Sequence, residues 1–181
     1  MKSLIILADS AQKDKQIFDL HIIIDLYANA LRKSEVGLFE DAISRLYRVI
    51  ELVAQHRLKS YGIETSNPSI NQYELAYKAV TKEVYGFEKP LPTEIGLKNG
   101  FLLLFILQDF IIKSYGLNDI KEMFGIIRAR DMSIIAHGLQ LAGEKVFVNL
   151  NSLARSFIKS LCENYNNDFA DLLSQHTFVK L

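Results

Sequence analysis

Apolar side chains recur every three or four positions along most of this chain, which is the spacing of an amphipathic α-helix. The longest stripe lies in residues 39–61 and is followed by Gly62, a residue typical of helix C-terminal caps. Glycine and proline, which interrupt helices, number only nine and three. We therefore predict an all-α fold, an irregular bundle of five to six helices. The expected helices cover residues 17–33, 39–61, 71–84, 97–113, 118–137 and 146–164.

Two segments need a separate interpretation. In residues 1–16 a short strand-like apolar run precedes a charged stretch, which is typical of a loose tail or of the linker after a missing N-terminal domain. We expect residues 17–181 to form the helical domain.

The very hydrophobic segment within residues 97–113 contains Gln108 and Asp109 and is shorter than the roughly 20 residues of a membrane-spanning helix. It is predicted to be a buried core helix, and the protein is expected to be cytoplasmic, without a membrane partner.

Charge does not indicate a general nucleic-acid binder, because 21 basic residues balance 21 acidic ones. Any RNA contact must therefore come from a local cluster of cations. The single cysteine, Cys162, excludes an internal disulfide and suits a reducing cytosol. Four scattered histidines beside one cysteine do not form the closely spaced ligand set of a structural zinc site. We expect neither a metal nor a cofactor.

Arg130 and His137 are the candidate catalytic residues. Residues seven apart in a helix are rotated by about 700°, so that they share a face and lie ~10 Å apart along the axis. Arginine is almost never fully buried without a partner, so this face suits a cleft or a subunit interface better than a monomer core. The other members of the stripe are apolar: Met123, Ile127, Ile134 and Leu141.

The pair has the chemistry that RNA cleavage requires. Histidine titrates near neutrality and can act as the base for the 2′-hydroxyl or as the acid for the leaving oxygen. Arginine stays charged, and its planar fork matches phosphate oxygens. Asp131 could orient the arginine, and Ser133 lies one turn before the histidine. Spacing alone also allows an ordinary interpretation, in which the histidine caps a helix end and the arginine is solvated or in a salt bridge.

The motif resembles that of the HEPN ribonucleases, in which an arginine, a polar residue and a short spacer precede a histidine. Here Arg130-Asp131 and His137 take these positions. Together with further residues, the motif is similar to the C-terminal domain of CRISPR-associated CARF–HEPN proteins of type III systems, over residues 17–164. The further residues are Arg45-Leu46-Tyr47-Arg48, Glu51, Ala54-Gln55 and Arg57-Leu58 in the long helix and Ser133 to Gly138 around the histidine.

This resemblance implies a prokaryotic, metal-independent endoribonuclease for single-stranded RNA, with a composite active site at a homodimer interface. In that family a CARF domain that binds cyclic oligoadenylate switches the ribonuclease on. Such a domain is far longer than residues 1–16, so we expect the sensor to be missing from this chain. The homodimer interface is expected to include residues 118–137 of each subunit.

Five other polar residues are candidates for supporting roles. Arg48, Glu51 and Gln55 share one face of the predicted long helix, and the resemblance implies that they hold the motif helix. An intrahelical Arg48–Glu51 pair would instead be an ordinary surface interaction. Arg45 and Arg128 could extend a positive groove for the RNA backbone, or form part of a solvated face.

Two other functions remain open. A toxin of a toxin–antitoxin pair would share the HEPN chemistry with a different partner, although the block from Arg45 to Leu58 favours the CRISPR group. A catalytically inert helical module that dimerises or binds another protein belongs to a different class. The presence of both Arg130 and His137 argues against it.

Overall fold

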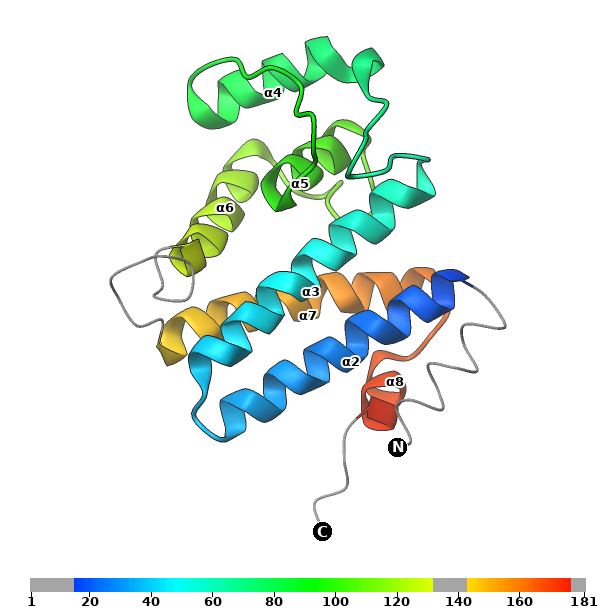
Figure 1. The fold of residues 1–181 in the computed structure, drawn as a ribbon, viewed down its shortest axis with the longest axis vertical. Coiled ribbons are helices and arrows are strands. Elements are labelled where there is room, and N and C mark those ends of the chain that lie inside the picture. The colour runs from blue at the N-terminus through cyan, green and yellow to red at the C-terminus, as the bar shows by residue number, and fades with distance from the viewer. Residues whose placement is uncertain (1–14, 132–142, 177–181) are drawn as a thin grey trace. The chain divides into compact units, whose positions relative to one another are not determined.

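The computed structural model describes residues 15–131 and 143–176, and side chains within 19–128 and 143–176. This part of the chain forms seven α-helices and one 3-10 helix and contains no strand, which confirms the all-α prediction (Figure 1). The helices are α2 (Lys15–Glu35), α3 (Phe39–Ser60), η1 (Asn71–Tyr73), α4 (Glu74–Tyr85), α5 (Leu97–Ile106), α6 (Leu117–Asp131), α7 (Glu144–Asn164) and α8 (Phe169–His176).

Most predicted helices have an observed counterpart, but the helix expected over residues 97–113 is wrong in its second half. Helix α5 ends at Ile106, and Gln108 adopts a positive φ of 55°. Asp109, directly after this residue, is buried and paired with Arg57. The eight-residue helix α8 was not predicted.

The start of the helical region differs slightly from the prediction. Helix α2 begins at Lys15, within the segment expected to be a tail. Residues 1–14 lie outside the described residues, so the proposed boundary at residue 16 stays a prediction. Among the described residues, no helix is both long enough and apolar enough to cross a membrane.

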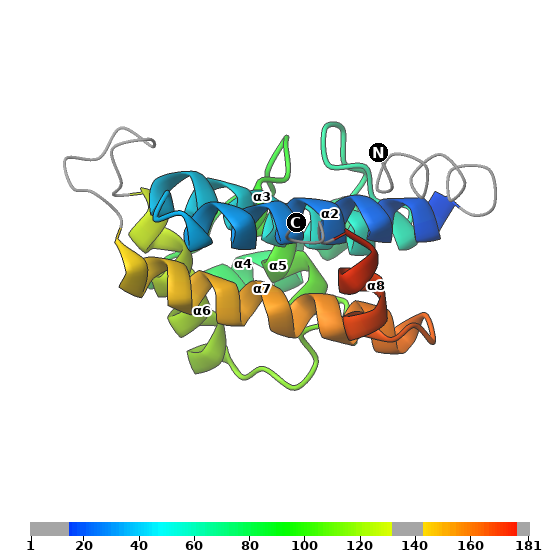
Figure 2. The same ribbon diagram turned by 90° about the horizontal axis from the view of Figure 1, so that it is seen from below.

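The chain divides into two compact units. One consists of Met1–Ile50 and Arg128–Leu181, and the other is Glu51–Ile127. In the first unit α2 lies beside α7, and α8 packs against both helices (Figures 1 and 2). Its core is apolar, because the inward faces of these helices carry fully buried side chains such as Ile24, Leu150 and Ile158.

The second unit contains the C-terminal part of α3 with α4, α5 and the first part of α6. Gly62 ends α3 as predicted: its φ is +73°, its N–H donates to the Lys59 carbonyl at 3.0 Å, and the Ile63 N–H donates to the Leu58 carbonyl at 3.0 Å. Helix α5 approaches α3 closely at Gly100, where an added Cβ would lie 3.3 Å from the Ala54 Cβ. This close packing supports the buried helix α5 that the sequence predicted.

Candidate functional site

The predicted catalytic motif begins in the last turn of α6. Arg130 and Asp131 belong to this helix, but their side chains lie outside the described residues, as do Ser133 and His137 entirely. The spacing of Arg130 and His137 on one helical face therefore stays a prediction. Two apolar members of the same stripe, Met123 and Ile127, are buried within the chain itself, although the sequence favoured a cleft or a subunit interface for this face.

The start of α6 is fixed by a side-chain cap. The backbone N–H of Gly116 donates to Asp119 Oδ2 at 2.7 Å. The bond satisfies an N–H group that the helix leaves without a partner, and it places a carboxylate at the positive end of the helix. Asp119 therefore caps the start of α6, and Ile120 beside it is fully buried.

Arg45 is half-buried at the start of α3 and is engaged there with Asp41. Its Nη1 donates to the Asp41 carbonyl at 3.0 Å and lies 3.5 Å from Asp41 Oδ1. Lys33 Nζ lies 3.3 Å from the same carboxylate, and its hydrogen bond, with the charges of both cations, lowers the pKa of Asp41. An RNA phosphate would therefore compete with Asp41 for Arg45. Arg48 and Arg128 are both exposed.

Glu51 and Gln55 lie together on the second part of α3. They lie beside Thr65, Gly96 and other residues of their unit around a narrow gap that has no room for a water molecule. Both side chains are half-buried. That Glu51 and Gln55 hold the motif helix, as the resemblance implies, stays a prediction.

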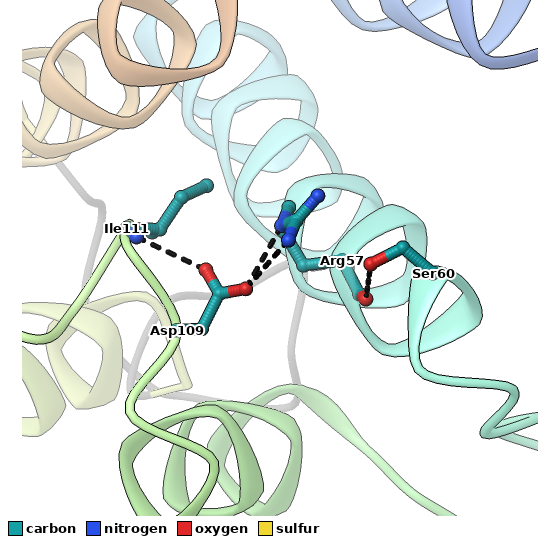
Figure 3. Close-up of polar contacts among 4 residues, drawn as sticks. All are labelled: Arg57, Ser60, Asp109 and Ile111. Carbon is teal, nitrogen blue, oxygen red and sulfur yellow. Dashed lines mark hydrogen bonds and ion pairs between the residues drawn. The ribbon is translucent and has the colours of Figure 1, made fainter. Parts of the chain in front are cut away.

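A buried ion pair joins α3 to the turn before α6 (Figure 3). Arg57 Nε and Nη2 donate to Asp109 Oδ2 at 3.0 and 2.8 Å, and Oδ1 of the same carboxylate accepts the Ile111 N–H at 3.0 Å. The Asp109 side chain is 0% exposed and that of Arg57 is 10% exposed. The guanidinium also lies 4.4 Å from the centre of the Phe110 ring, a cation–π distance.

The sequence pattern did not indicate this ion pair, although it contained one relevant feature. An aspartate inside a strongly apolar segment must find a counter-charge, because an isolated carboxylate is very costly to bury. Asp109 is such a residue, but the identity of its partner, 52 positions away, could not be read from a local pattern.

A second buried polar cluster connects α2 to α8. His21 Nδ1 lies 2.9 Å from His176 Nε2, and His176 Nδ1 lies 3.3 Å from Asp25 Oδ1. Arg32 Nη1 donates to the His176 carbonyl at 3.0 Å. In the arrangement that satisfies all of these atoms, His176 donates to Asp25 and accepts from His21. The sequence indicated nothing for either histidine, because they are 155 positions apart.

Stability should fall in acid because of this histidine pair. Burial lowers the pKa of His21, with a further contribution from His176, and burial also lowers the pKa of His176 against the opposing effect of Asp25. The unfolded chain, with histidine pKa values near 6.5, then binds more protons than the folded one. The stabilisation is complete above about pH 6.5 and is lost as the pH falls below it towards the lowered pKa values of the folded state.

Urea unfolding measured between about pH 7.5 and pH 5 tests this expectation. A His21→Gln/His176→Gln variant should lose most of the pH dependence that the pair adds. Equal acid sensitivity in the variant and the unchanged protein would contradict the assignment.

Within residues 15–131 and 143–176, no group of three or more histidine, cysteine or carboxylate side chains is arranged to hold a metal ion. Cys162 is buried there, and burial raises the pKa of its thiol to about 11. A thiol in this environment is a poor nucleophile, because the thiolate is the reactive form. Among the residues singled out, Arg130 and His137 remain the candidates for chemistry.

The sequence is similar to a known domain family over most of its length. A family model described as the Csm6 HEPN domain matches residues 10–162, a range that includes both Arg130 and His137. The CRISPR system endoribonuclease Csm6 of Thermus thermophilus is 24% identical over 119 residues, covering 64% of this chain and 26% of that relative. The chain thus spans about a quarter of the relative's length.

Proposed function

Because this chain belongs to the Csm6 HEPN domain family, we propose that it is a CRISPR-associated ribonuclease domain that cuts single-stranded RNA. The observation that carries this proposal is the extent of the family match, which includes the whole segment from Arg130 to His137. The similarity to an enzyme named as an endoribonuclease supports it.

In the proposed reaction the RNA 2′-oxygen attacks the adjacent phosphorus. His137 takes the 2′ proton or gives a proton to the departing 5′-oxygen, and Arg130 stabilises the additional negative charge on the phosphate. Asp131 orients the guanidinium, and Ser133 supports the histidine from one helical turn before it. The P–O5′ bond breaks, leaving a 2′,3′-cyclic phosphate on one product and a 5′-hydroxyl on the other.

We propose that two copies of the chain combine to form the active site. A two-fold axis along α6 would bring two Arg130–His137 pairs together. Both arginines would then face a shared RNA site, whereas in the core of a monomer they would be buried charges. Sedimentation should then show a dimer at micromolar concentration, and a monomer would contradict this arrangement. Control by cyclic oligoadenylate, which the resemblance assigns to a CARF domain, is not a property that we propose for these 181 residues.

Cleavage should survive chelation and require the 2′-hydroxyl. Labelled single-stranded RNA incubated with the protein and EDTA should be cut at the rate seen without EDTA, since the proposed mechanism uses only side chains. RNA with a 2′-deoxy or 2′-O-methyl group at the cut site should resist, because it lacks the nucleophile. Mass spectrometry should show a 2′,3′-cyclic phosphate on the upstream product, and cleavage of DNA at a comparable rate would rule the mechanism out.

A further inference from the structure

Two aromatic side chains and a lysine form a cluster at the C-terminal end of α4. Phe87 is 58% exposed, and its ring centre lies 6.4 Å from that of the half-buried Tyr85. Lys89 Nζ lies 3.6 Å from the centre of the Tyr85 ring and 5.4 Å from that of Phe87. We call these three residues the α4 aromatic cluster.

The cluster is held in place by its own unit. The Tyr85 ring stacks on Phe124 of α6 with 6.2 Å between centres and 14° between planes. Gly86, at φ 85°, ends α4 and reverses the chain, and the backbone N–H of Lys89 donates to the buried Thr81 Oγ1 at 3.0 Å. The Tyr85 ring and the backbone at Lys89 are therefore anchored, which limits the conformational freedom lost when a ligand binds.

The charges around the cluster leave its lysine available. Lys82 Nζ lies 3.6 Å from Glu88 Oε1, so the Glu88 carboxylate is paired with Lys82. The Lys89 ammonium lies over these two rings and has no ion-pair partner among the residues that the structure describes. An ammonium over an aromatic face is only weakly held at a partly exposed site, so an anionic ligand can draw it away.

We propose that the α4 aromatic cluster binds an unpaired nucleotide of the RNA substrate, with the base stacked on Phe87 and Lys89 paired with its phosphate. This inference rests on the proposed function. Single-stranded nucleic acids are commonly bound by exposed aromatic side chains beside cations, because every base offers a face for stacking. Because the chain has no net positive charge, RNA must be held by local sites, and this cluster offers one.

RNA affinity is measured in the His137→Ala variant, which is expected not to cut the RNA during the measurement. Fluorescence anisotropy of a short labelled oligouridylate gives the Kd for this protein and for the same protein with Phe87→Ala or Phe87→Leu. Both added changes should weaken binding about five- to a hundredfold, because they remove a stacked base. Phe87→Tyr should keep the affinity, and Lys89→Gln should reduce the dependence of Kd on salt.

Leu75 provides the matched control, because it is 84% exposed in the same unit and is not aromatic. Leu75→Ala should bind within about twofold of the background protein, and circular dichroism should show that each variant is folded. Unchanged affinity in both Phe87→Ala and Phe87→Leu would overturn the inference and leave the exposed ring to a protein contact. Equal weakening by Leu75→Ala would also overturn it.

The result also separates this inference from the proposed function. If the unmodified protein cuts RNA but Phe87→Ala leaves both cleavage and binding unchanged, only the aromatic subsite is wrong. If the unmodified protein neither binds nor cuts RNA, the proposed function fails and the subsite fails with it.

Discussion

Replacing either Arg130 or His137 with alanine should lower the rate of RNA cleavage at least about a hundredfold while leaving the melting temperature nearly unchanged. Losing a general acid–base group, or a charge that stabilises the transition state, typically removes a factor of this size, roughly 3 kcal/mol of barrier stabilisation. Such a group contributes little to folding, since its interactions are completed only when substrate is bound.

The opposite result is expected if the two residues are structural. Each alanine would then leave a buried partner without its hydrogen bond, at a cost of about 1–3 kcal/mol of unfolding free energy. Cleavage rate and thermal midpoint should therefore be measured on the same preparations of each variant. Lys121→Ala, an exposed change on the same helix, serves as the control. Variants that cut RNA normally but melt early would contradict the catalytic assignment.

The second large effect concerns stability. Replacing Asp109 with asparagine or Arg57 with methionine should each lower the free energy of unfolding by about 3–5 kcal/mol, because each leaves a buried charge without its counter-charge. The Asp109 carboxylate is 0% exposed, so water cannot take the place of the lost partner. Urea unfolding monitored by circular dichroism measures the change.

The double variant Arg57→Met/Asp109→Asn measures the interaction between the two residues themselves. It should lose much less than the sum of the two single changes, because no uncompensated charge remains in the interior. Additive losses would contradict a direct interaction. Glu74→Ala, which breaks the exposed Lys78–Glu74 pair, should change stability only slightly, since solvent already screens that pair.

Much of the helical architecture was determined by the sequence alone. The apolar spacing that predicted α3 is a local property, since residues three and four apart always share a helical face. The same holds for Gly62, whose positive φ suits glycine. The candidate motif could also be read directly, because Arg130, Asp131 and His137 are defined by identity and spacing along one segment.

Only the tertiary structure decided which distant polar residues meet. Arg57 and Asp109 are 52 positions apart, and His21 and His176 are 155 apart. No periodic pattern connects such pairs, because their contact depends on how separate helices pack. The early end of α5 lies beside such a contact: the local apolar pattern favours a continuous helix, whereas the chain turns just before the buried Asp109, which is paired with Arg57.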